Sequence, residues 1–168
     1  MRAILVMGVS GVGKSTIGKG LAQRIGATFL DADDFHPPEN VARMAAGQPL
    51  TDDMRWPWLD RLISEANKVR ADRDVVLACS ALRRSYRDHL REGIADLVVA
   101  YPDAPRDLIA QRMQARAGHF MPPALLESQF ATLEVPTPDE GTLTINVDQP
   151  VDAIVAQIVD AVTCLFSS

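Results

Sequence analysis

A glycine-rich run that ends in a lysine and a serine is the pattern with the clearest chemistry in this chain. Residues 8–15, GVSGVGKS, fit G-x-x-x-x-G-K-[ST] at every fixed position. Glycines let backbone N–H groups approach a phosphate chain closely, Lys14 reaches the outer phosphates, and the Ser15 hydroxyl can join a Mg²⁺ shell. The alternative is a chance glycine-rich turn. The motif predicts nucleotide binding through Gly8, Ser10, Gly11, Val12, Gly13, Lys14, Ser15 and Thr16.

Acidic residues follow the second apolar run of the chain, at Asp31, Asp33 and Asp34. A carboxylate beside the phosphate site can hold the water shell of Mg²⁺ or accept the proton of an attacking hydroxyl. We assign Asp31 to the metal and Asp33 to the acceptor, and expect Asp34 to face solvent. The alternative for all three is the general preference of aspartate for loops. His36 could contact the ligand, although a lone histidine is more often structural.

Arginines gather after the other predicted strands. Arg55 lies at the start of a predicted helix, where its guanidinium could fork onto a carboxylate. Arg83 and Arg87 are four residues apart, which predicts one helical face and an anion site. Arg112 and Arg116 precede a glycine and are typical of a mobile lid that excludes water and neutralises phosphate charge. A solvated basic helix face is the alternative for each pair.

The elements that must position these residues alternate between apolar runs and helical periodicity, which predicts an α/β fold with a parallel sheet and helices on both faces. The predicted strands are 3–7, 28–30, 74–79, 96–101 and 143–147. The predicted helices are 15–25, 38–46, one that Thr51 could cap, 83–91, 105–116, 124–132 and a last one that begins after Pro150 and buries positions 151–165 on one face. Ligands of such sheets gather at the carboxyl ends of the strands, where the polar clusters lie.

Length and composition narrow the class of protein. The 168 residues favour a single domain, and the net charge of −5 argues against nucleic acid as a partner. Cys79 and Cys164 are too far apart for a disulfide framework, so we expect two buried thiols and a reducing compartment. No stretch resembles a signal peptide or a membrane span of ~20 apolar residues. The cytoplasm is the expected location.

Six segments of the chain, in this order, resemble the P-loop gluconokinases of bacteria and eukaryotes: the glycine run, LDADDFHP, AAGQPLTDDMRWPWL, CSALRRSYRDHLR, RAGHFMP and NVDQP. The resemblance covers nearly the whole chain. The segments around residues 49–59 and 79–91 distinguish this family from the shikimate kinases and nucleoside monophosphate kinases. Two positions depart from the pattern: Asp34 stands where an apolar residue is common, and Arg84 stands where lysine is common.

The resemblance implies a reaction and an architecture. ATP and Mg²⁺ would serve transfer of a phosphoryl group to the 6-hydroxyl of D-gluconate, giving 6-phospho-D-gluconate and ADP. The sheet would have the order 2-3-1-4-5, with an acceptor-binding helical region at about 36–72 and a lid at about 113–135. A cytoplasmic homodimer that feeds the pentose phosphate or Entner–Doudoroff route is also implied.

The resemblance also implies roles for individual residues. The catalytic residues would be Lys14, Asp33 and Arg116. The acceptor would be bound by Asp33, His36, Arg55 and Arg83, with Arg87 assisting. Ser15 and Asp31 would hold the metal. The nucleotide would be contacted on its adenine side by Arg112, Asp148, Gln149 and Pro150, and at its phosphates by Arg116.

Two alternatives to this reading remain at this point. One is a related small-molecule kinase for shikimate or a nucleoside monophosphate, against which the segments 49–59 and 79–91 argue. The other is a nucleotide-binding switch that does not turn over a metabolite. Acceptor-dependent release of ADP separates an enzyme from a switch.

Overall fold

The computed structural model describes residues 1–115 and 123–167, and within them the chain forms a sheet of five parallel strands. The strands are β1 Ala3–Val6, β2 Thr28–Asp31, β3 Val75–Ala78, β4 Leu97–Asp103 and β5 Leu143–Asn146. Their order is β2-β3-β1-β4-β5, and each neighbouring pair is parallel. This confirms the implied order 2-3-1-4-5. It also places β1, which leads into the glycine run, at the centre of the sheet.

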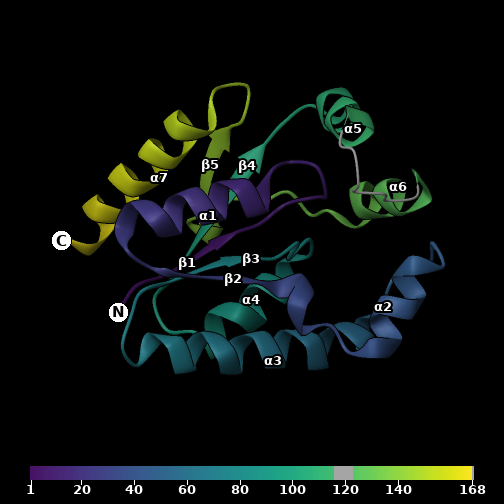
Figure 1. The fold of residues 1–168 in the computed structure, drawn as a ribbon, viewed down its shortest axis with the longest axis horizontal. Coiled ribbons are helices and arrows are strands. Elements are labelled where there is room, and N and C mark those ends of the chain that lie inside the picture. Colours follow the sequence, from purple (N-terminus) through teal and green to yellow (C-terminus); the bar gives the residue numbers. More distant parts are fainter. Residues whose placement is uncertain (116–122, 168) are drawn as a thin grey trace.

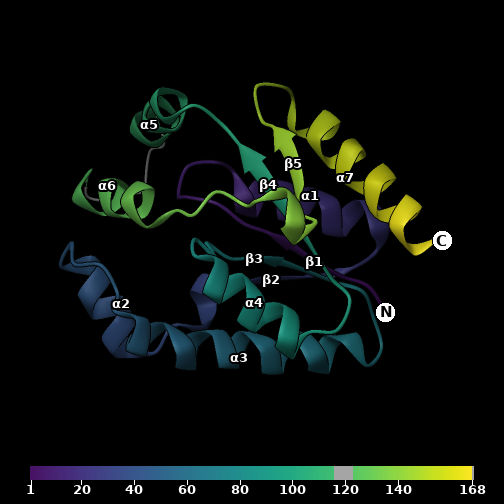
Figure 2. The ribbon, with the colours of Figure 1, turned by 180° about the vertical axis from the view of Figure 1, so that it is seen from behind.

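Helices cover both faces of this sheet, as Figure 1 shows and Figure 2 repeats from behind. The helical elements are α1 Lys14–Ile25, η1 Ala32–Phe35, α2 Pro38–Ala45, α3 Asp52–Arg70, α4 Arg84–Gly93, α5 Arg106–Ala115, α6 Pro123–Thr132, η2 Pro138–Glu140 and α7 Val151–Phe166, where η marks a short 3₁₀ helix. In both views α1 and α7 lie on one face, and α3 and α4 lie on the other. Helices α2 and α6 extend at the end of the molecule opposite the two termini.

The central strand contributes to two hydrophobic cores because successive side chains of a strand point to opposite faces. Ala3 and Leu5 pack with α3 and α4, whereas Ile4 and Val6 pack with α1 and α7. All four residues are fully buried. A continuous apolar run is therefore required here, and this burial fixes the position of the loop that follows β1.

Some details differ from the sequence expectations. Arg83 has an extended backbone (φ −95°, ψ 148°), and α4 begins only at Arg84, so Arg83 and Arg87 do not share a helical face. Cys164 and Leu165 are exposed rather than buried, because the last turn of α7 continues beyond the apolar face that ends at Val162. Thr51 precedes α3 but makes no side-chain capping bond. The 3₁₀ helices η1 and η2 were not predicted.

Candidate active site

The loop between β1 and α1 has the backbone geometry that phosphate binding requires. Gly8, Gly11 and Gly13 have φ values of 131°, 85° and 97°, in the region that residues with a side chain rarely adopt. A Cβ atom on Gly11 would also lie 2.6 Å from Cγ of Met113. Gly13 is the N-cap of α1, whose N-terminus directs backbone N–H groups and partial positive charge toward the loop. This geometry is suited to binding an anion such as phosphate.

Two side chains whose oxygen atoms could ligate a metal ion, Ser15 and Asp31, are in contact beside this loop. The Ser15 hydroxyl on α1 donates to Oδ2 of Asp31 at the end of β2, at 2.9 Å. The other carboxylate oxygen, Oδ1, accepts the backbone N–H of Asp33 at 3.0 Å and so caps η1. Lys14 lies next to them, and its Nζ donates to the Val9 carbonyl at 3.1 Å. The structure therefore brings together the two residues that were predicted to hold a metal.

Asp33 and His36 lie on the short helix η1 and at its C-terminal end. The Asp33 side chain is 85% exposed, borders the cleft described below, and has Oδ1 3.6 Å from Nε2 of His36. The His36 ring is buried and stacks on Trp58 with ring centroids 4.1 Å apart. Nδ2 of Asn40 lies 3.3 Å from Nδ1 of His36, and Nε1 of Trp58 donates to the Ala32 carbonyl. The turn that carries the exposed carboxylate of Asp33 is therefore held by ring stacking and by hydrogen bonds.

A second polar cluster joins the start of α3 to α4. Nη1 of Arg55 donates to the Tyr86 hydroxyl at 3.1 Å, and that hydroxyl donates to Asp52. Asp52 also forms ion pairs with Arg55 (3.6 Å) and Arg83 (3.7 Å). The hydrogen bond from Tyr86, followed by the charges of Arg83 and Arg55, lowers the pKa of Asp52. Burial and the bond to Asp52 raise the pKa of Tyr86. The cluster therefore contains two cations and one anion.

One cleft connects these groups. It has a volume of about 640 Å³ and is bordered by Ser10, Lys14, Ser15, Asp31, Asp33, His36, Arg55 and Tyr86, together with residues of α2 and α6. Ser10, in the glycine loop, donates its N–H to Oε1 of Gln129 on α6 at 2.7 Å. We call the part of the cleft lined by the glycine loop, Ser15 and Asp31 its phosphate end, and the part lined by Arg55 and Tyr86 its acceptor end.

A smaller cleft of about 290 Å³ opens on the other side of the glycine loop. Its lining includes Val12, Thr16, Arg112 and Gln149. Nη2 of Arg112 donates to the Val147 carbonyl at 3.2 Å, so the arginine is anchored to the segment after β5. The predicted adenine-side residues Arg112 and Gln149 are thus brought together. Asp148 and Pro150 flank Gln149 in the chain and do not border this cleft.

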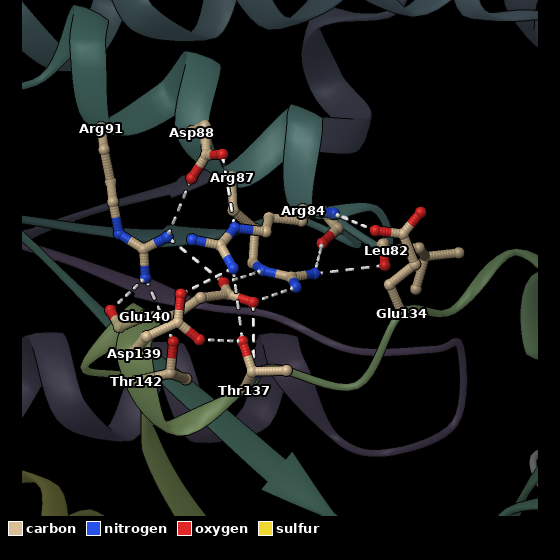
Figure 3. A network of polar contacts seen from close by, with 11 residues as sticks. Leu82, Arg84, Arg87, Asp88, Arg91, Glu134, Thr137, Asp139, Glu140 and Thr142 are labelled. Atoms are coloured by element: carbon tan, nitrogen blue, oxygen red, sulfur yellow. Dashed lines mark hydrogen bonds and ion pairs between the residues drawn. The ribbon is translucent and has the colours of Figure 1, made fainter.

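Arg87 is not where the sequence analysis placed it. Its side chain is fully buried, and its Nε and Nη2 donate to the two carboxylate oxygens of Glu140 at 2.7 and 2.8 Å (Figure 3). Nη1 donates to the carbonyls of Ala81 and Leu82. The Arg87 hydrogen bond is the main reason that the pKa of Glu140 falls to about 2. Because its donors are used inside the protein, Arg87 does not contact the acceptor cleft.

Several residues of the cleft were missed by the sequence analysis. Tyr86 and Gln129 border it, and Asn40 supports its base. Tyr86 could have been found, because it lies in the family-specific segment CSALRRSYRDHLR. Gln129 could not, because no sequence motif surrounds it. Arg116, predicted as a catalytic lid arginine, lies outside the described residues.

Other features have less bearing on the site. Burial raises the pKa of the Cys79 thiol to about 12, so this thiol stays protonated and unreactive. In the described part of the chain, no helix is both long and apolar enough to span a membrane.

Comparisons with known proteins agree with this geometry. A family model described as an AAA domain matches residues 4–136. A gluconokinase of Gluconobacter oxydans is 44% identical over 162 residues, which covers 94% of this chain and 89% of that protein. The crystal structure of a gluconokinase from Sinorhizobium meliloti has a TM-score of 0.86 and 42% identity, with 98% of this chain and 93% of that chain covered. A shikimate kinase from Aquifex aeolicus covers 99% of both chains at a TM-score of 0.63 and 14% identity, a likeness of fold alone. The chain belongs to the gluconokinase family of P-loop kinases.

Proposed function

We propose that this kinase transfers the γ-phosphoryl group of ATP to the 6-hydroxyl of D-gluconate. The observation that carries the proposal is one cleft that is lined by the glycine loop, by Asp33, and by Arg55 with its partner Tyr86. The names of the similar proteins support gluconate as the acceptor. Shikimate and nucleoside monophosphates are less well supported, because the likeness to shikimate kinase extends to the fold only.

The phosphate end would bind ATP through the N–H groups of the glycine loop and through Lys14. Ser15 and Asp31 would hold Mg²⁺, and their oxygens, 2.9 Å apart, fit a hard cation that prefers oxygen ligands. Mg²⁺ is usually bound through one or two carboxylates together with the substrate phosphates, so a larger protein cage is not required. When bound, Mg²⁺ would supply neutralisation of charge on the β- and γ-phosphate oxygens.

Asp33 would orient the 6-hydroxyl and accept its proton. As the hydroxyl oxygen bonds to the γ-phosphorus, the bond from phosphorus to the leaving oxygen of ADP breaks in line with it. The carboxylate is suited to this role because it borders the cleft on a turn whose backbone N–H is held by Asp31. Most of the rate enhancement would come from positioning and electrostatic stabilisation.

The acceptor end would recognise the carboxylate of gluconate. Arg55 offers a planar guanidinium held by Tyr86, with its side chain only 15% exposed. Charge-assisted hydrogen bonds to such a group are strong because little water competes for it. Arg83 is not among the lining residues and would add positive charge through its contact with Asp52, and the buried ring of His36 would form part of the wall.

The remaining assignments follow from the family. The acceptor-binding helical region would span about 36–72, and the lid about 113–135, with Arg116 brought to the phosphates in the closed form. Arg112 and Gln149 would lie against adenine, with Asp148 and Pro150 shaping the loop behind them. We also propose a cytoplasmic homodimer acting in the pentose phosphate or Entner–Doudoroff route.

Coupled release of ADP tests the proposal. ATP and Mg²⁺ are supplied with D-gluconate, shikimate, glucose, AMP or no acceptor. A rate that depends on gluconate, with a product phosphorylated at the 6-position, is the expected result. A rate with another acceptor would replace the substrate. Tight ATP binding with no acceptor-dependent rate would favour a nucleotide switch.

A further inference from the structure

The loop after β3 has an unusual backbone at the edge of the acceptor cleft. Ala81 is buried and has φ 44°, a left-handed conformation that a residue with a side chain adopts only when its surroundings impose it. Its neighbours Ser80 and Leu82 border the cleft. The Ser80 carbonyl also accepts the N–H of Gly8, the first residue of the glycine loop, at 3.1 Å. The shape of this loop therefore affects the cleft directly.

The side chain of Arg87 is hydrogen-bonded to this loop. Nη1 of Arg87 donates to the carbonyls of Ala81 and Leu82 at 3.0 and 3.2 Å. Its other donors are directed to Glu140, and the paired side chains are 0% and 1% exposed. Figure 3 shows the Arg87 guanidinium between α4 and the segment that carries Glu140. A planar guanidinium can make all four bonds at once, whereas the point charge of a lysine cannot.

Glu140 is itself held in place by the segment that follows α6. Its Oε1 accepts the backbone N–H of Thr137 in a capping box. Arg91 donates to its carboxylate and to its carbonyl oxygen. Earlier in the same segment, the Glu134 N–H donates to the Leu82 carbonyl at 2.8 Å. The pair thus fastens the end of α6 to the loop after β3.

Both fastened elements border the acceptor cleft. Helix α6 contributes Leu125, Ser128, Gln129 and Thr132 to the lining, and Gln129 also contacts the glycine loop. Ser80 and Leu82, in the loop after β3, line the same cleft as α6. A small displacement of such supports can change substrate positioning without removing any contact to the ligand.

We propose that Arg87 and Glu140 are positioning residues that set the shape of the acceptor end of the cleft. Neither side chain lines the cleft. They act through the left-handed loop at Ala81 and through the end of α6. The inference rests on the proposed kinase function, since it concerns how that cleft holds its acceptor.

The test compares two identical substitutions on one helix. Arg87→Lys keeps the buried charge but loses the forked geometry, and Arg84→Lys makes the same change at an exposed arginine that pairs with Asp139. Steady-state constants for gluconate and for ATP are measured well below the unfolding midpoint of each variant. We expect Arg87→Lys to raise the KM for gluconate about tenfold, with the KM for ATP within about twofold of wild type. Arg84→Lys should match wild type.

Glu140→Gln provides a second variant, because it keeps the side-chain size and breaks the same pair from the carboxylate side. It should raise the KM for gluconate in the same way. A lower unfolding midpoint with unchanged constants for gluconate would overturn the inference and leave a purely structural ion pair. Equal losses for gluconate and ATP would also overturn it.

The proposed function and this inference fail in different ways. If wild type and Arg84→Lys show no gluconate-dependent rate, the proposed substrate is wrong, and the comparison is repeated with the acceptor that is used. If wild type uses gluconate and Arg87→Lys behaves identically, only the positioning role is wrong.

Discussion

At the phosphate end of the cleft the binding groups come from one continuous loop, whereas at the acceptor end they come from separate elements. The loop residues 8–15 present backbone N–H groups whose directions are set by left-handed glycines. The acceptor end is made of side chains, and the hydrogen bond between Tyr86 and Asp52 joins positions 34 apart. The first device suits any nucleotide phosphate. The second can be changed one side chain at a time, so we expect it to determine which acceptor is used.

The largest expected effect lies between the two ends, at Asp33. Asp33→Asn should lower kcat by about 10²–10⁴-fold, because a general base contributes roughly that much, while the KM for gluconate changes little. Steady-state kinetics with coupled detection of ADP measures both constants. Asp34→Asn, at the next exposed carboxylate, is the control and should retain wild-type values. A small loss in Asp33→Asn would assign Asp33 to orientation alone.

The buried pair beneath the acceptor end should appear in the acid stability of the protein. Hydrogen bonding to Arg87 lowers the pKa of Glu140 from 4.5 to about 2, so the stabilisation is present above about pH 4.5 and is lost as the pH falls toward 2. Glu140→Gln should lower the unfolding free energy at neutral pH by roughly 3 kcal/mol, and the difference should vanish in acid.

Urea unfolding over this pH range measures the effect. Asp139→Asn is the matched control, since this exposed carboxylate is screened by water and should alter the profile much less. Parallel curves for wild type and Glu140→Gln down to pH 2 would contradict the assigned role of the ion pair.

The proposed metal ligands Ser15 and Asp31 give a test of the phosphate end. Asp31→Asn should raise the Mg²⁺ concentration needed for half-maximal rate by about 10–100-fold, because it removes the negative charge of a metal-ligand oxygen beside Ser15. Titration of Mg²⁺ at saturating ATP and gluconate measures this shift. An unchanged Mg²⁺ requirement would mean that Asp31 acts only through its capping bond to the N–H of Asp33.

A smaller effect is expected at Tyr86, on the acceptor side. Tyr86→Phe removes the hydroxyl that accepts from Arg55 and donates to Asp52. Of the two hydrogen bonds lost, the one that holds Arg55 is worth about 1 kcal/mol, and its loss should raise the KM for gluconate about fivefold and leave the KM for ATP unchanged. Tyr101→Phe, at another buried tyrosine, is the control. Equal changes in both KM values would show that the two ends are not independent.

The features that could be predicted from the sequence are formed by continuous segments, whereas those that were missed are formed by separate elements. The strand patterns and the glycine motif depend on neighbouring residues, so the sheet and the glycine loop could be predicted. The sheet order itself came from the family resemblance. Contacts between distant segments left no such pattern, which is why the partnership of Gln129 with Ser10 was missed.

Arg87 shows why charge spacing alone misleads. Arg83 and Arg87 looked like one basic face, but α4 starts one residue later, and Arg87 lies three positions before the buried Leu90 on the inner face of the helix. A buried arginine requires a buried carboxylate. The capping-box pattern T-P-D-E at residues 137–140 was the available signal for Glu140, but nothing local connects it to Arg87.

The most direct test of the account compares an acceptor with and without its carboxylate. D-gluconate and D-glucitol differ in this group alone at one end, and kcat/KM is measured for both with wild type and with Arg55→Met. The account predicts a strong preference for gluconate in wild type that largely disappears in Arg55→Met and persists in Arg61→Met, an exposed control on the same helix. A preference that survives in Arg55→Met would contradict the claim that the acceptor end recognises a carboxylate through Arg55.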